Sequence, residues 1–247
     1  MRLILAILLF AIPLPAQAAD KLPFILIHGG WGGGQGWWKV KSLLEKQGHR
    51  VFAPSLPGQG DRAQEGGPHV NLTSHVNAIV ALIARERLEH VVLVGHSLGG
   101  MVVSGVAERT PEKLARLVYV DAFLPQHGES AFDQMAPAFV ATLKKRAADR
   151  GEGWAIASND GKGPPQPIGT LEERISLTNP AAAAIPGTYI LTMDQGAKVD
   201  AFSGAAARAR RKIWPVHVLH TGHLPQVTMP ATLADLLIEA ALASQPY

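Results

Sequence analysis

The sequence contains no cysteine among its 247 residues. This absence excludes a disulfide framework, a thiolate zinc site, an iron–sulfur cluster and a catalytic cysteine. Aromatic residues make up only 6% of the chain, and the formal net charge is a small +3. The short basic runs 144–146 and 208–212 lack the aromatic neighbours of a surface that binds single-stranded nucleic acid. We therefore expect solvated helix faces there and no nucleic-acid partner.

The sequence also lacks a long apolar run. The longest apolar stretch near the start of the chain covers only residues 3–12. A single positive residue, Arg2, precedes the apolar stretch 3–12, and Ala16-Gln17-Ala18 follows it. A spanning helix needs about 17–25 apolar residues, so this stretch is too short to be one. The pattern is typical of a secretory signal peptide over residues 1–18, with an uncleaved anchor or a buried first strand as the alternative. We expect an exported, periplasmic or secreted protein with no stable membrane insertion after cleavage.

The rest of the chain, residues 19–247, alternates short apolar runs with amphipathic stretches. Expected strands lie at 22–27, 50–53, 91–94, 117–120, 189–193 and 216–219. Expected helices lie at 36–47, 72–87, 98–109, 199–210 and 232–243. This alternation predicts one α/β domain, with a mostly parallel sheet of about six strands and helices on both faces.

The alternation stops between residues 124 and 186. A helical stretch at 130–150 is followed by the loop-forming residues 159–165. An insert of about sixty residues is too long for an ordinary connection, and such inserts usually form lids or binding loops. We therefore predict a helical cap over this segment.

The most informative stretch follows the third expected strand. It reads Gly95-His96-Ser97-Leu98-Gly99 and opens a helix. Strand, G-x-S-x-G and helix in that order indicate a nucleophile elbow, a strained turn that exposes a serine hydroxyl at the top of a sheet. Ser97 is the predicted nucleophile. The N–H of Leu98 would lie at the start of the helix, directed at an oxyanion.

Together with other blocks, this motif resembles the α/β-hydrolase superfamily over residues 22–242. The blocks are His28-Gly29-Gly30, Leu56-Pro57-Gly58-Gln59-Gly60, Gly95 to Gly100, and Thr221-Gly222-His223. Residues 28–37 and 119–125 look like the small methylesterase and hydroxynitrile-lyase branch, which includes bacterial esterases. The resemblance implies the α/β-hydrolase fold with a helical cap.

The resemblance also implies the roles of further residues. The backbone N–H groups of Gly30 and Leu98 would form the oxyanion hole, with the N–H of Trp31 as a further candidate donor beside Gly30. The family's order of serine, acid and histidine selects His223 as the base in preference to His220. Asp194, after the fifth expected strand, is the predicted acid, and Asp121, after the fourth, is the alternative.

Two further histidines stand next to the predicted machinery. His28 precedes the glycine-rich turn and His96 precedes Ser97. His28 lies at the wrong end of the chain for a base, and the geometry of the elbow turns His96 away from the cleft. We expect both to be structural hydrogen-bonding residues.

These features predict a secreted serine hydrolase that cleaves small carboxylic esters through an acyl-enzyme and needs no metal or cofactor. The candidate pocket residues are apolar: Trp31, Phe123, Phe132, Met135 and Phe139. One alternative is a hydroxynitrile-lyase-type C–C lyase, which in that branch uses a lysine after the histidine and a threonine in the oxyanion turn. Leu224 and Gly29-Gly30 occupy those positions and favour the esterase. The other alternative is a non-catalytic ligand-binding protein of the same fold.

Overall fold

The computed structural model describes residues 21–158, 163–194, 196 and 200–243. The predicted leader, residues 1–18, lies outside the described residues, so its cleavage stays a prediction. No helix in the described part of the chain is long and apolar enough to cross a membrane.

The central element is a six-stranded sheet in the order β2-β1-β3-β4-β7-β8, with every neighbouring pair parallel. The strands are β1 (Phe24–Ile27), β2 (Val51–Phe52), β3 (Val91–His96), β4 (Leu114–Val120), β7 (Gly187–Thr192) and β8 (Val216–Leu219). This sheet confirms the predicted fold class, and each strand overlaps its predicted range. Because all strands run the same way, their carboxyl ends meet at one edge, where ligands bind in open α/β sheets.

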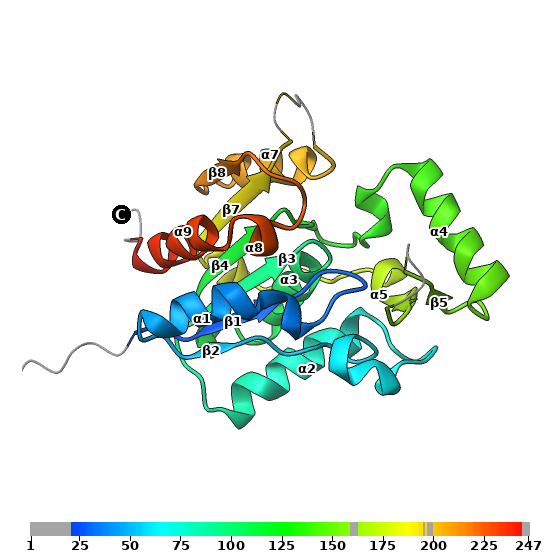
Figure 1. Ribbon diagram of the computed structural model, residues 1–247, viewed down its shortest axis with the longest axis horizontal. Coiled ribbons are helices and arrows are strands. Elements are labelled where there is room, and N and C mark those ends of the chain that lie inside the picture. Colours follow the sequence, from blue (N-terminus) through cyan, green and yellow to red (C-terminus); the bar gives the residue numbers. More distant parts are fainter. Residues whose placement is uncertain (1–20, 159–162, 195, 197–199, 244–247) are drawn as a thin grey trace, which may run out of the picture.

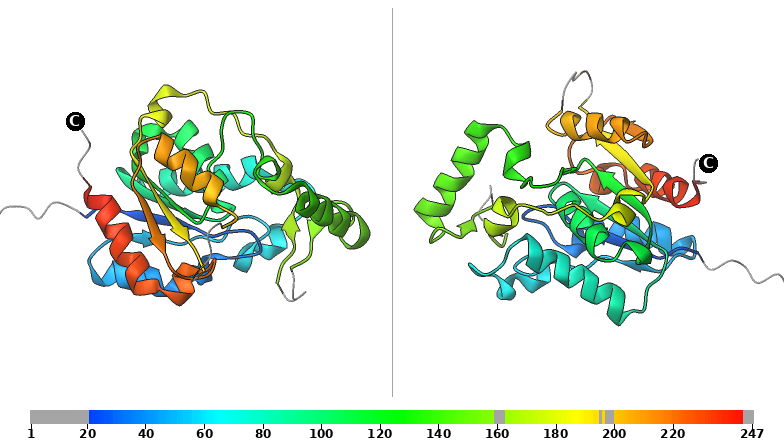
Figure 2. Two further views of the ribbon diagram at one scale, coloured as in Figure 1. Left: turned by 90° about the horizontal axis from the view of Figure 1, so that it is seen from above. Right: turned by 180° about the vertical axis from the view of Figure 1, so that it is seen from behind.

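Helices cover both faces of the sheet, as the left view in Figure 2 shows. The helices and 3₁₀ turns outside the cap are η1 (Gly34–Trp37), α1 (Trp38–Lys46), η2 (Gly60–Glu65), α2 (Leu72–Arg85), α3 (Gly99–Arg109), η3 (Pro111–Lys113), α7 (Ser203–Arg211), α8 (Pro225–Thr228) and α9 (Pro230–Leu242). Helices α1 and α9 share one face, and α2, α3 and α7 lie on the other (Figures 1 and 2).

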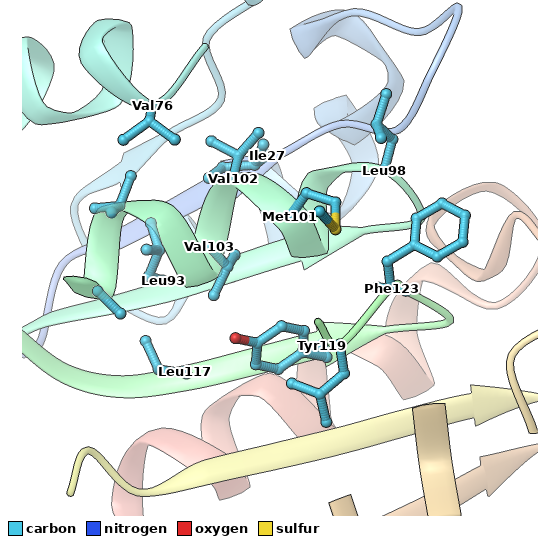
Figure 3. Packing of buried hydrophobic residues seen from close by; sticks show 14 of the residues in the cluster. Ile27, Val76, Leu93, Leu98, Met101, Val102, Val103, Leu117, Tyr119 and Phe123 are labelled. Atoms are coloured by element: carbon cyan, nitrogen blue, oxygen red, sulfur yellow. The ribbon is translucent and has the colours of Figure 1, made fainter. Parts of the chain in front are cut away.

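The period-2 alternation of each strand divides the core into two clusters. Phe24 and Leu26 of β1 pack with α1 and α9, whereas Ile25 and Ile27 pack with α2 and α3. Both faces of the sheet are therefore dry, which explains why the strands read as continuous apolar runs. Figure 3 shows side chains of α3, β3 and β4 in the second cluster, with Leu98 and Phe123 at its end.

The predicted cap lies between β4 and β7. It contains η4 (Phe132–Gln134), α4 (Pro137–Arg150), a small antiparallel hairpin of β5 (Ala155–Ile156) and β6 (Gln166–Pro167), α5 (Gly169–Glu172) and α6 (Pro180–Ala183). The expected single helix 130–150 is in fact two elements, because Pro137 starts a new helix at a position where its missing N–H costs nothing. Figure 1 shows α4 standing away from the sheet.

Candidate active site

Ser97 occupies a strained turn between β3 and α3. Its φ is 53°, in the left-handed region that non-glycine residues rarely adopt. A Cβ on Gly95 would lie 2.6 Å from the carbonyl oxygen of Gly99, so only glycine fits there. The turn is held by β4, since Ser97 N donates to Val120 O at 3.2 Å and Phe123 N donates to Ser97 O at 3.1 Å. These contacts form the predicted nucleophile elbow.

The glycine-rich turn after β1 approaches this serine closely. A Cβ on Gly29 would lie 2.8 Å from Ser97 Cβ. Gly30 and Leu98 line the same cavity as Ser97, and neither N–H makes a hydrogen bond within the described part of the chain. The N–H of Trp31 donates to Gln166 Oε1 at 2.9 Å and is already used. The two backbone donors expected from the sequence are thus available to an oxyanion.

His223 follows β8 and also lines this cavity. Its Nδ1 lies 2.6 Å from Asp121 Oδ2, and Asp121 is 0% exposed. The ring stacks on Phe202, with centroids 5.2 Å apart and planes within 5°. The ring bond of His223 goes to Asp121 through Nδ1, and no hydrogen bond joins Ser97 Oγ to His223 among the described residues. Such contacts are often loose in ligand-free sites and tighten when substrate binds.

The prediction that Asp194 partners the histidine is wrong. Asp194 is exposed, two residues beyond the end of β7, and His223 contacts Asp121, the stated alternative. The reason is the position of each aspartate relative to the strand that carries Ser97. Asp121 directly follows β4, which lies between β3 and β7, and its left-handed φ of 44° turns the chain there.

The buried carboxylate of Asp121 is held on both sides. Its Oδ1 accepts the N–H of Thr192 at 3.0 Å, and its own N–H donates to Ile190 O at 2.7 Å. Its Oδ2 is left for His223. A carboxylate placed this way fixes the imidazole with the proton on Nδ1, so that Nε2 is free to accept one.

The two histidines expected to be structural are both buried and hydrogen bonded. His96 Nε2–H donates to the carbonyl oxygen of His223 at 2.7 Å. Burial, reinforced by repulsion from His223, lowers the pKa of His96 to about 3. His28 Nε2 accepts the N–H of Leu56 at 3.0 Å, and its Nδ1–H donates to Gly29 O at 2.7 Å. Burial lowers the pKa of His28 as well. Burial therefore disfavours the charged form of both rings, in keeping with structural roles.

A third buried histidine, His75 on α2, gives a pH prediction. Burial lowers its pKa from 6.5 to about 4, although its ring donates to Pro57 O at 3.0 Å. Between those values the unfolded chain binds the proton and the folded chain does not, so stability falls as pH drops below 6.5. From pH 7 to 5 this histidine should cost about 1–2 kcal/mol.

The test compares thermal or urea unfolding of the parent and of His75→Gln at both pH values. The variant should lose less stability on acidification, by roughly that 1–2 kcal/mol. The exposed His69 provides the control His69→Gln, which should acidify like the parent. Equal pH sensitivity of all three proteins would contradict the buried neutral state of His75.

The cavity that contains Ser97, here called the Ser97 cavity, has a volume of about 830 Å³. Four predicted pocket residues line it: Trp31, Phe123, Met135 and Phe139. The prediction for Phe132 is wrong. Its side chain is buried in the core, and Lys144 Nζ lies 5.4 Å from its ring centroid. Phe132 and Met135 both line a shallower pocket beside the cap, and of the two only Met135 also lines the Ser97 cavity.

Sequence reasoning missed several residues around this cavity. Phe202 stacks on the histidine, and Leu224 and Val227 line the cavity with side chains that are nearly half exposed. Gln166 of the cap contacts the oxyanion turn. Leu224 and Val227 follow His223 closely in sequence and could have been proposed from that proximity. No sequence signal marks Gln166, because it follows a stretch of loop-forming residues.

Comparison with known proteins places the chain in a family. A family model for the alpha/beta hydrolase family matches residues 24–236. A carbendazim hydrolyzing esterase from Nocardioides sp. (strain SG-4G) is 32% identical over 242 residues, which cover 87% of this chain and 97% of that protein. Methylesterase 1 from Arabidopsis thaliana is 36% identical over 112 residues, covering 44% of this chain and 43% of its own.

Solved structures agree with the sequence matches. The structure of a pyrethroid hydrolase from Sphingobium faniae JZ-2 superposes with a TM-score of 0.70 at 27% identity, covering 92% of this chain and 100% of that one. The relatives include esterases and other hydrolases. The resemblance to the methylesterase branch and its bacterial esterases is thereby confirmed, and the chain belongs to the alpha/beta hydrolase family.

Proposed function

We propose that this protein is a serine hydrolase that cleaves uncharged carboxylic esters through an acyl-enzyme on Ser97. One observation carries the proposal. A serine on a strained elbow, a histidine bonded to a buried carboxylate and two unused backbone N–H groups all surround one cavity. The three side chains are Ser97, His223 and Asp121.

Each group has a defined part in the reaction. Ser97 Oγ attacks the acyl carbon while His223 Nε2 takes the hydroxyl proton, and the carbonyl oxygen becomes an oxyanion. The N–H groups of Gly30 and Leu98 stabilise that charge. The C–O bond to the alcohol then breaks, and the alcohol leaves with the proton from His223. Water deprotonated by the same imidazole attacks the acyl-enzyme, which releases the acid and restores Ser97.

The lining of the Ser97 cavity supports an uncharged substrate with apolar groups. Within the described ranges, no Asp, Glu, Lys or Arg side chain lines the cavity. The indole ring of Trp31 and the phenyl rings of Phe123 and Phe139 line it. Its volume lies in the upper part of the range of about 300–1,000 Å³ for ligand sites. The names of two relatives, a carbendazim hydrolyzing esterase and a pyrethroid hydrolase, support a hydrolase of small molecules.

The proposal is tested with a matched pair of esters. The purified protein should hydrolyse p-nitrophenyl valerate. It should hydrolyse the mono-p-nitrophenyl ester of glutaric acid with a kcat/KM at least about 10-fold lower, because burying the added carboxylate without a partner costs more than about 1.4 kcal/mol. Equal turnover of both esters would contradict the uncharged-substrate part.

A covalent probe tests the nucleophile separately. A fluorophosphonate should label the protein once, and mass spectrometry of the digest should locate the adduct on the peptide that contains Ser97. Absence of both labelling and ester turnover would overturn the hydrolase proposal and favour the non-catalytic binding alternative. The lyase alternative lacks support, since neither lysine nor threonine lines the described cavity. Mandelonitrile cleavage in the absence of ester hydrolysis would restore it.

A further inference from the structure

The cap hairpin of β5 and β6 is joined to the turn that follows β1. Trp31 makes two bonds to it: its backbone N–H donates to Gln166 Oε1 at 2.9 Å, and its indole Nε1–H donates to Ile156 O at 2.7 Å. Gln166 belongs to β6 and Ile156 to β5, which pair with each other. The turn after β1, residues 28–31, is here called the oxyanion turn. It is thus held by a hairpin that lies more than a hundred residues away in the sequence.

The amide of Gln166 has only one orientation that satisfies its neighbours. The side chain is 0% exposed. Its Nε2 donates to Thr170 Oγ1 at 2.7 Å, and that hydroxyl donates onward to Pro167 O at 2.7 Å. Because the hydroxyl proton is used on a carbonyl, the hydroxyl accepts from Gln166. The amide oxygen is therefore fixed toward Trp31 N–H.

This bond acts where the backbone is strained. Trp31 has a φ of 53°, a left-handed conformation that costs a non-glycine residue about 1–2 kcal/mol. The bond to Gln166 directs the Trp31 N–H at the cap and away from the cavity. Gln166 Oε1 also lies 3.3 Å from the position of a Cβ on Gly30. Gly30 lines the Ser97 cavity, and its N–H is bonded to no acceptor among the described residues.

We propose that Gln166 is a positioning residue for the oxyanion hole: by holding Trp31 it sets the direction of the Gly30 N–H. The inference rests on the proposed hydrolase function. It assigns to the cap a part in the chemical step, in addition to covering the substrate. Undocking of β6 would turn the Gly30 N–H away from the developing charge while Ser97 and His223 stay in place.

A second buried glutamine provides a matched control. Gln59, also 0% exposed, donates from Nε2 to Pro165 O at 2.8 Å, one residue before Gln166. It joins the hairpin to the turn after β2, and no hydrogen bond links it to Trp31 in the described part of the chain. Replacing either glutamine by methionine keeps the length of the side chain and removes one buried tie to the same hairpin. Only the Gln166 variant also removes the acceptor of the Trp31 backbone N–H, while the indole bond to Ile156 remains.

The experiment measures kcat and KM for p-nitrophenyl valerate and inhibition by phenylboronic acid, which forms a tetrahedral adduct on the serine. Loss of one oxyanion donor lowers kcat by about 10²–10³, and Gln166→Met misaligns one without deleting it. We expect kcat to fall about 10- to 100-fold, KM to change less than about 3-fold, and boronate affinity to fall with kcat. Gln59→Met should keep kcat within about 3-fold.

The outcomes separate this inference from the proposed function. Parent protein that neither hydrolyses esters nor reacts with a fluorophosphonate would overturn both. An active parent whose Gln166→Met variant keeps kcat and boronate affinity would overturn the positioning role alone. Equal losses of kcat in both glutamine variants would reduce the role to general cap docking. If Gln166→Met does not fold, Thr170→Val frees the Gln166 amide instead, and an unchanged kcat would then overturn the inference.

Discussion

Replacing Asp121 with asparagine should lower kcat for ester hydrolysis by about 10⁴-fold with little change in fold. The Thr192 N–H already fixes which atom of the side chain faces which neighbour, because it needs an acceptor. In Asp121→Asn the amide oxygen keeps that bond, and the amide NH₂ then faces His223 Nδ1. Nδ1 becomes an acceptor, so the ring proton moves to Nε2, which can no longer take the proton of Ser97.

Asp194→Asn is the matched control, because it makes the same chemical change at the residue that the sequence favoured. We expect kcat within about 2-fold of the parent, because Asp194 is exposed and the ring of His223 is bonded to Asp121 instead. Stopped-flow or steady-state assays with p-nitrophenyl valerate measure both variants, and near-identical unfolding temperatures would exclude misfolding. A large loss in Asp194→Asn with little loss in Asp121→Asn would show that the hydrogen bond to Asp121 is not the functional one.

The contrast between the two aspartates shows where sequence reasoning stops. Both follow an apolar strand and precede the histidine in the chain, so order and spacing fit either one. The difference is spatial: β4 is next to β3, which delivers Ser97, whereas Asp194 lies beyond the end of the next strand along. Strand order depends on which strand edges hydrogen-bond to each other. The residues around each aspartate do not encode that long-range pairing.

Local patterns predicted more where one residue type alone fits. Ser97 and Gly95 were identifiable because a tight strand-to-helix turn needs a glycine before the serine. The paired N–H groups of Gly30 and Leu98 followed from the same motifs. The strands were found because residues such as Ile25 and Leu26 are buried on opposite faces, which makes the whole run apolar.

The cap was predicted as a region but not in detail. Phe132 and Met135 are three residues apart in the expected helical stretch 130–150, and sequence alone placed both in the pocket. A 3₁₀ turn and then Pro137 interrupt the expected helix, so only Met135 faces the Ser97 cavity. The role assigned to Gln166 depends on its hydrogen bonds with Trp31 and Thr170, which only the structure shows. Long-range contacts between irregular segments leave no periodic signal in the sequence.

The close approach of α3 to the segment after Asp121 gives the second large prediction. A Cβ on Gly100 would lie 2.1 Å from the carbonyl oxygen of Phe123 and 3.0 Å from Ala122 Cβ. Backbone atoms on both sides must move to relieve such a clash. We expect Gly100→Ala to lower the free energy of unfolding by about 2–4 kcal/mol, which corresponds to a melting temperature lower by about 5–15 °C.

Gly204 offers a control of the same kind, because it is the second residue of α7 as Gly100 is of α3. A Cβ on Gly204 would meet no atom within 4 Å. Gly204→Ala should therefore leave stability unchanged or raise it by up to about 1 kcal/mol through helix propensity. Differential scanning calorimetry compares the two. Because the Gly100 contact borders both Ser97 and Asp121, its variant should also lose turnover at temperatures where it remains folded. A Gly100→Ala protein as stable and active as Gly204→Ala would mean that the elbow and the 122–123 segment are not packed as tightly as this structure has them.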